Sequence, residues 1–240
     1  MEARDRLIVA LDVTTAAEAQ KLVQAVGDSV STFKVGKQLF TAEGPSVVRD
    51  LVASGRKVFL DLKFHDIPNT VAGAVRAAAG LGVSMLTVHA SGGAKMLRAA
   101  ADAAQSSKNP PLVLAVTVLT SLGNEDLQEV GVSGGVAGQV LRLAGLAREN
   151  GCRGVVASPQ EVKQLRATLG AGFAIVTPGV RPAGADPGDQ ARIATPAEAI
   201  RNGASHLVVG RPITEAKHPA QAAETFLKEI EAAAGESRNK

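Results

Sequence analysis

Charged residues stand in or just after short apolar runs, where they could act together in one reactive site. Asp12 lies at the end of the run LIVALDV, Lys34 lies in TFKVG, and Asp61 and Lys63 lie in VFLDLKF, which Asp66 follows closely. Because Asp61 and Lys63 are two residues apart, the period of a β-strand points both side chains to the same side.

This charge array has two interpretations, an interior salt-bridge network or a catalytic electrostatic field. Burying several ions together costs several kcal/mol per ion, so a dense network is a poor source of stability. Charges fixed in advance are, by contrast, an effective way to stabilise charge that develops in a reaction. Neighbouring carboxylates keep a lysine protonated, and such an ammonium group can stabilise a carbanion and then donate a proton to it. We therefore favour a catalytic role.

An anion site is predicted after the last apolar run, HLVVGR. Gly210 offers a backbone N–H and Arg211 a cation, the groups that bind phosphate after the last strands of many barrel enzymes. An ordinary strand end with a surface arginine would show the same two residues. Arg181 and Gln190 lie at the ends of a Gly/Pro-rich segment that is either a lid over the same anion or a solvated loop.

The elements that must position these residues follow a repeated pattern. Short β-branched apolar runs alternate with Ala-rich segments of helical periodicity. Near-continuous apolar strands indicate a parallel sheet buried on both faces, and eight βα units fit a closed (β/α)8 TIM barrel of the α/β class. An open doubly wound sheet is the alternative. We expect one domain over residues 1–240, with the site at the carboxyl ends of the strands. The runs begin at Leu7, Thr32, Val58, Met85, Leu112, Gly154, Phe173 and His206.

Local signals mark where helices begin and end. Thr15 with Glu18, and Thr195 with Glu198, have the spacing of a capping box. Two helical stretches are expected after the fifth run, at about 124–130 and 135–150. Glycines that should close helices in a left-handed conformation are Gly27, Gly80, Gly82, Gly151 and Gly203.

Composition excludes several classes of partner. The 240 residues include 26 basic and 23 acidic ones, a net charge of +3, with no Trp and no Tyr. Proteins that bind single-stranded nucleic acid stack bases on aromatic rings, so a nucleic-acid polymer is disfavoured. Neither a signal peptide nor an apolar stretch of membrane-spanning length is present, so we expect a cytoplasmic protein without a membrane partner.

Cysteine and histidine give little support for a metal site. Cys152 is the only cysteine, so neither an intrachain disulfide nor a thiolate cluster can form, and we interpret it as structural. His65, His89, His206 and His218 lack the spacing of metal ligands. His89 is interpreted as a packed, hydrogen-bonded residue.

The motifs together resemble the orotidine 5′-phosphate decarboxylase family. A shorter DxKxxD pattern is shared with related sugar-phosphate decarboxylases and hexulose-phosphate synthases. The IPNT and VTVLTS segments are therefore what distinguishes this family from those related enzymes. The motifs that carry the resemblance run in order along the chain: LDV at 11–13, FKVG at 33–36, DLKFHDIPNT at 61–70, AVTVLTS at 115–121, TPGVRP at 177–182, DQxR at 189–192 and VVGRPI at 208–213.

This resemblance implies a homodimeric barrel that converts orotidine 5′-phosphate to UMP and CO2, the last step of de novo pyrimidine synthesis, without a metal or cofactor. It implies that Lys63 protonates C6 of the product and that Asp61 lies near the substrate carboxylate. It places Lys34 between Asp61 and the ribose, and Asp12 on the ribose hydroxyls.

The resemblance also implies roles for the remaining candidates. Asp66, Ile67 and Thr70 would reach across the dimer interface into the neighbouring site, and Thr120 would lie by the pyrimidine or its closing loop. The phosphate would be bound by Arg181, Gln190, Gly210 and Arg211. Two alternatives remain: a magnesium-dependent enzyme acting on a pentulose or hexulose phosphate, and a barrel that binds a phosphate ligand without catalysis.

Overall fold

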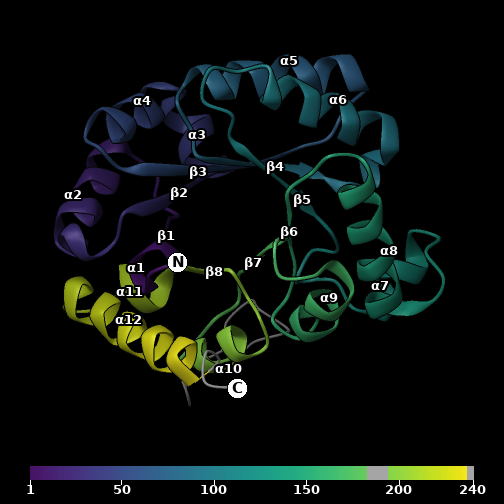
Figure 1. The fold of residues 1–240 in the computed structure, drawn as a ribbon. Helices are drawn as coiled ribbons and strands as arrows, with labels where there is room; N and C mark the ends of the chain where they lie inside the picture. Colours follow the sequence, from purple (N-terminus) through teal and green to yellow (C-terminus); the bar gives the residue numbers. More distant parts are fainter. Residues whose placement is uncertain (183–193, 237–240) are drawn as a thin grey trace.

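The strands form a closed barrel. The computed structural model of the protein describes residues 1–182 and 194–236, and within them eight parallel strands pair in chain order, with β1 also paired to β8 (Figure 1). This closure confirms the predicted (β/α)8 barrel and rules out the open sheet. The strands are β1 (Leu7–Leu11), β2 (Thr32–Gly36), β3 (Lys57–Phe64), β4 (Met85–His89), β5 (Leu112–Val116), β6 (Gly154–Val156), β7 (Ala174–Thr177) and β8 (His206–Val209).

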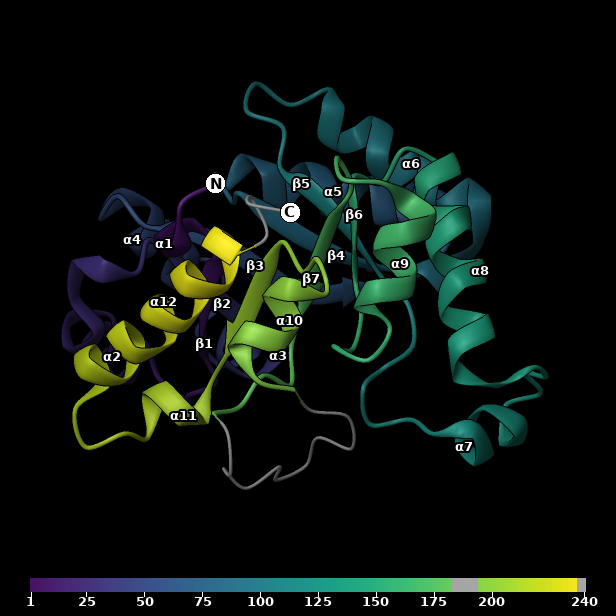
Figure 2. The same ribbon diagram turned by 60° about the horizontal axis from the view of Figure 1, so that its bottom comes forward.

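The helices surround the outside of the strand ring (Figure 1). Seen from the side, α11 lies at one end of the barrel and the N-terminus at the other (Figure 2). None of the described helices is long and apolar enough to cross a membrane. The helices are α1 (Ala3–Arg6), α2 (Ala16–Val26), α3 (Lys37–Glu43), α4 (Ser46–Ala53), α5 (Pro68–Gly80), α6 (Gly93–Gln105), α7 (Asn124–Glu129), α8 (Gly135–Glu149), α9 (Val162–Leu169), α10 (Pro196–Arg201), α11 (Arg211–Thr214) and α12 (Pro219–Glu236), with short 3-10 turns η1 (Gly27–Ser29) and η2 (Ala90–Gly92).

The apolar side chains form two separate clusters, as the alternation of a strand requires. In β1, Leu7, Val9 and Leu11 face the helices, whereas Ile8 and Ala10 face the barrel interior. The interior cluster is small and joins residues of six strands: Ile8, Ala10, Phe59, Met85, Leu114, Val176 and Val208. Positions of the same strands that lie further along the chain and face inward therefore point to the carboxyl end of the barrel.

Most of the predicted helix ends are confirmed. Both capping boxes form, with Thr15 capping α2 and Thr195 capping α10. The stretches predicted at 124–130 and 135–150 are α7 and α8, each ending one residue earlier. Gly27, Gly82, Gly151 and Gly203 have positive φ angles, as predicted. The prediction for Gly80 is wrong, because it is the last residue of α5 and Gly82 takes the left-handed conformation instead.

Candidate active site

A cavity of about 540 Å³ lies at the carboxyl ends of the strands. This volume is within the range of small-molecule sites. Eight of the predicted site residues line it: Asp12, Lys34, Asp61, Lys63, Thr120, Arg181, Gly210 and Arg211. Residues far apart in the sequence therefore meet at the end of the barrel where enzymes of this architecture build their sites.

The first charged pair joins β2 to the end of β1. Lys34 Nζ donates to Asp12 Oδ1 at 2.8 Å. The Lys34 side chain is 11% exposed and that of Asp12 is 61% exposed, so the carboxylate faces the open cavity. A Cβ atom at Gly36 would lie 3.1 Å from Lys34 Nζ, so glycine at this position leaves room for the ammonium group.

The second charged pair lies within β3. Lys63 Nζ donates to Asp61 Oδ2 at 2.8 Å, and both side chains are largely buried. Both side chains point to the cavity side of the strand, as predicted, but a regular strand is not the reason. The pairing of β3 with β4 shifts register between Leu60 and Phe64, and Lys63 has a φ angle of 52°. This left-handed conformation costs a lysine about 1–2 kcal/mol.

A buried threonine on β4 connects both residues of this pair. The backbone N–H of Lys63 donates to Thr87 Oγ1 at 2.9 Å, and that hydroxyl donates to Asp61 Oδ1 at 2.9 Å. Thr87 is fully buried. Sequence reasoning missed Thr87; the available signal was a polar residue at an inward-facing position of an apolar strand.

The wall of the cavity formed by the carboxyl ends of β7 and β8, next to β1, carries two arginines. Arg181 is buried, and its Nη1 donates to the carbonyl oxygen of Val180 at 3.0 Å. Arg211 begins α11 directly after Gly210 and is exposed. The cavity lining around these cations also includes Thr214 and Glu215 after β8, and Thr120 and Ser121 after β5. Gln190, together with most of the predicted lid segment, lies outside the described residues.

Three predicted site residues lie outside this cavity. Asp66, Ile67 and Thr70 are exposed and are not among the residues that line it. Ile67 is 67% exposed, which is unusual for a large apolar side chain, and its N–H donates to Asp66 Oδ1 at 2.6 Å. Within one chain, these residues form a surface beside the site rather than part of it.

Two buried titratable residues outside the charged pairs have strongly shifted pKa values, His89 at the carboxyl end of β4 and Cys152 before the amino end of β6. His89 ends β4 and packs against His65 with ring centroids 5.4 Å apart. Burial, reinforced by the charges of His65 and Lys63, lowers the pKa of His89 to about 4, so its imidazole is neutral at physiological pH. Burial raises the pKa of Cys152 to about 12, in agreement with its predicted structural role. Among the described residues, no group of three or more His, Cys, Asp or Glu side chains is placed to hold a metal.

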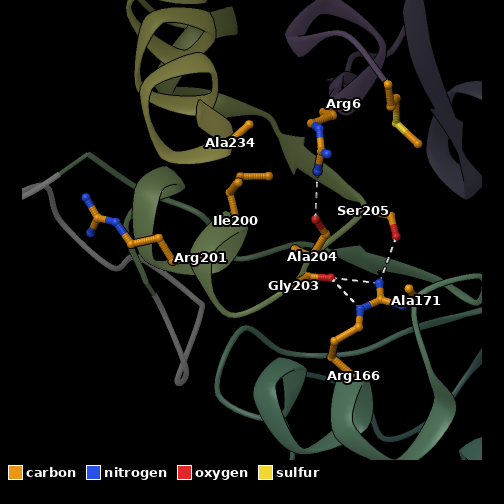
Figure 3. Close-up of a pocket in the computed structure, with 10 residues that line it drawn as sticks. Arg6, Arg166, Ala171, Ile200, Arg201, Gly203, Ala204, Ser205 and Ala234 are labelled. Atoms are coloured by element: carbon orange, nitrogen blue, oxygen red, sulfur yellow. Dashed lines mark hydrogen bonds between the residues drawn. The ribbon is translucent and has the colours of Figure 1, made fainter. Parts of the chain in front are cut away.

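A second cleft, at the opposite end of the barrel, is lined by Arg6, Arg166 and Arg201. Figure 3 shows the Arg166 side chain directed at the segment before β8, and Arg201 pointing away from it. All five N–H groups of Arg166 are engaged, by the carbonyl oxygens of Gly170, Phe173 and Gly203 and by the Ser205 hydroxyl. No donor of Arg166 is left for a ligand, and its role is structural.

The fold and the cavity define a barrel protein whose strand ends combine two Lys–Asp pairs with cationic groups after β7 and β8. The family model described as "Orotidine 5′-phosphate decarboxylase / HUMPS family" matches residues 5–226. The chain therefore belongs to this family.

Relatives and solved structures agree with this membership. The chain is 56% identical over 237 residues to the orotidine 5′-phosphate decarboxylase of Moorella thermoacetica, covering 96% of this chain and 94% of that one. It is 56% identical to that of Halorhodospira halophila over 228 residues, covering 95% and 97%. The crystal structure of orotidine 5′-phosphate decarboxylase from Lactobacillus acidophilus superposes with a TM-score of 0.84 at 42% identity, covering 93% of this chain and 98% of that one. The names of these relatives describe carboxy-lyases, and the chain is an enzyme of that class.

Proposed function

We propose that the protein decarboxylates orotidine 5′-phosphate to UMP and CO2 in the cytoplasm, as the last step of pyrimidine nucleotide synthesis. The observation that carries this proposal is the buried Asp61–Lys63 pair beside the Lys34–Asp12 pair in one cavity. The family membership and the names of the relatives support the choice of substrate.

The proposed reaction needs a charge placed next to C6 of the pyrimidine ring. The bond from C6 to the carboxylate breaks, its electron pair stays on C6, and CO2 leaves. The Lys63 ammonium stabilises this carbanion and then transfers a proton from Nζ to C6, giving UMP. Because Asp61 already holds the ammonium at 2.8 Å, little reorganisation is needed when the charge develops.

The other residues would bind the remote parts of the substrate. Asp12 accepts hydrogen bonds from the ribose hydroxyls, and Lys34 lies between Asp61 and the ribose. Thr120 lies by the pyrimidine. The phosphate is bound by Arg181, Gly210 and Arg211, with Gln190 as a further ligand. Binding energy from the phosphate can then be used to hold the reacting carbon against Lys63.

The assay that tests this proposal measures UMP formation from orotidine 5′-phosphate in the presence of a chelator. We expect turnover to persist with the chelator, because the proposed chemistry uses neither a metal nor a cofactor. Loss of turnover on chelation would instead favour the magnesium-dependent alternative acting on a pentulose or hexulose phosphate. Tight nucleotide binding without turnover would favour a non-catalytic barrel.

The role of Lys63 is tested by substitution with a control on the same strand. Lys63→Ala should lower kcat about 10²- to 10⁴-fold, the usual contribution of a general acid. Lys57→Ala is the matched control, because Lys57 begins β3 at the opposite end of the barrel and forms an exposed pair with Asp5. Unchanged turnover in Lys63→Ala would contradict the assigned role.

We also propose that a second copy of the chain completes the site. Asp66, Ile67 and Thr70 are exposed next to the cavity of their own chain, and Ile67 presents apolar surface to solvent. Covering this surface with a partner would bury Ile67 and bring Asp66 towards the neighbouring cavity. The site would then be shared between the two subunits of a homodimer.

A further inference from the structure

One buried hydroxyl group holds both residues of the β3 charge pair. We propose that Thr87 is a positioning residue, which fixes the Asp61 carboxylate and the Lys63 ammonium in their working geometry. The inference rests on the proposed function, since it assumes that this pair performs the reaction. Thr87 does not line the cavity and acts only through its two neighbours.

The first part of the argument concerns the backbone of Lys63. Among the described residues, Lys63 is the only non-glycine residue with a positive φ angle. Leu60 pairs with Leu86 and Phe64 with Val88, so four steps along β3 match only two along β4. Regular ladder pairing is therefore interrupted at Lys63. The Thr87 side chain replaces it by accepting the Lys63 N–H at 2.9 Å.

The second part concerns the orientation of the carboxylate. The same hydroxyl donates to Asp61 Oδ1 at 2.9 Å, while Asp61 Oδ2 faces Lys63 Nζ at 2.8 Å. With one partner on each oxygen, rotation of the carboxylate is restrained, and so is the ammonium group that it holds. Thr87 has no exposed surface, so water cannot take the place of the hydroxyl.

The third part is that the side chain at this buried position must both donate and accept a hydrogen bond. A threonine hydroxyl has one proton to donate and lone pairs to accept, and both capacities are used here. Valine has the same shape without the hydroxyl, whereas serine keeps the hydroxyl without the methyl group. The pair of substitutions therefore separates hydrogen bonding from packing.

The experiment compares Thr87→Val, Thr87→Ser and a control at Thr117. Thr117 is also buried, on the neighbouring strand's end, and its hydroxyl donates only to the carbonyl oxygen of Val156 at 3.0 Å. Each variant is assayed for kcat and KM with orotidine 5′-phosphate and for its thermal midpoint. Thr87→Val should lower kcat about 10- to 100-fold, as expected when hydrogen bonds to a charged pair are lost.

The remaining outcomes separate positioning from stability. We expect KM of Thr87→Val to change less than about 3-fold, because the substrate is not contacted. Thr87→Ser should recover most of kcat. Thr117→Val should lose comparable thermal stability while keeping wild-type kcat.

The inference is overturned if Thr87→Val keeps wild-type kcat, or if Thr87→Ser is as impaired as Thr87→Val. Its failure can be told apart from failure of the proposed function by Lys63→Ala. If Lys63→Ala loses turnover but Thr87→Val does not, only the positioning role is wrong. If Lys63→Ala itself keeps turnover, the proposed mechanism is wrong.

Discussion

Lys63, the proposed proton donor, has a strained backbone conformation. Its left-handed backbone is unfavourable for a lysine, and unfavourable conformations of this kind concentrate at functional sites. The hydrogen bonds of Thr87 and the ion pair with Asp61 hold it there. This unfavourable backbone conformation directs the ammonium group into the cavity.

His206 is predicted to make the stability of the protein depend on pH. Burial lowers its pKa to about 4, with Arg6 and Lys57 lowering it further and Asp5 opposing them. Its Nδ1 has no hydrogen-bond partner among the described residues. In the unfolded chain the pKa of this histidine is about 6.5. Between about pH 6.5 and 4 the unfolded chain therefore binds a proton at His206 that the folded chain does not bind. The stability that neutral His206 contributes is present above about pH 6.5 and is lost as the pH falls towards 4, by up to about 3 kcal/mol.

Urea unfolding at several pH values between 7 and 4.5 measures this dependence. His206→Gln should flatten the loss of stability on acidification, because the glutamine does not titrate. His218→Gln is the control, since His218 is exposed and should leave the pH dependence as in the wild type. Equal slopes for wild type and His206→Gln would show that another group is responsible, such as His89, whose pKa is also about 4.

At the scale of elements, periodicity predicts most of the structure because it reflects burial. The eight apolar runs correspond to the eight described strands, and both capping boxes have their predicted hydrogen bonds. Such features depend on residues close together in the chain. Most of the cavity could be placed as well, because inward-facing charges at strand ends must meet at the mouth of a barrel.

The features that sequence could not predict depend on neighbouring strands. The register shift between β3 and β4 places Lys63 in its unusual conformation, and alternation alone predicts a regular strand there. The contact of Thr87 with β3 depends on the same register shift, because its hydroxyl accepts a hydrogen bond from the Lys63 N–H, which has no partner in the strand ladder. The exposure of Asp66 and Ile67 in one chain, by contrast, agrees with the interface position that the family resemblance implied for them.

Arg166 joins three elements at the end of the barrel opposite the cavity. It lies on α9 and binds the carbonyl oxygens before β7 and β8. Gly203, with a φ angle of 104°, allows this contact, because a Cβ there would lie 2.7 Å from Arg166 Cγ. Arg166→Lys keeps the charge but loses the planar fork of donors.

We expect Arg166→Lys to destabilise the protein by about 1–3 kcal/mol, because several buried carbonyl groups lose their donors. In a chain of this size, the thermal midpoint falls by about 2–4 °C for each kcal/mol. The turnover number at low temperature should stay unchanged, because the cavity lies at the other end. Arg201→Lys is the control, since Arg201 is half exposed and pairs with Glu236. A thermal midpoint of Arg166→Lys as high as that of the control would contradict the structural role.

At the scale of the whole molecule, the proposed active site lies at one end of the barrel, and the residues predicted to control stability lie at the other. The carboxyl ends hold the two Lys–Asp pairs together with Arg181 and Arg211, whereas Arg166 and His206 lie at the amino ends. The lack of Trp and Tyr disfavours a nucleic-acid polymer. The lack of these residues is compatible with a single bound nucleotide, because one base in a closed cavity can be recognised by hydrogen bonds, by apolar packing and through a bound phosphate.

The proposed sharing of the site between two subunits predicts that two inactive variants restore each other's activity. In a hybrid dimer of Lys63→Ala and Asp66→Ala, one site carries both substitutions and the other carries neither. Random exchange in an equal mixture gives hybrids as half of the dimers, each with one intact site, so about a quarter of wild-type activity should return. Turnover of orotidine 5′-phosphate, measured before and after mixing, gives this fraction.

A mixture of Lys63→Ala with Asp61→Ala is the control that makes the result specific. Both residues belong to the same chain's cavity, where they form one ion pair, so every site of a hybrid dimer still carries a substitution. This mixture should stay inactive. If the first mixture also stays inactive although mass spectrometry shows that subunits have exchanged, Asp66 acts within its own chain or not at all. Restored activity in the first mixture alone would mean that the exposed Asp66 surface completes the partner's cavity.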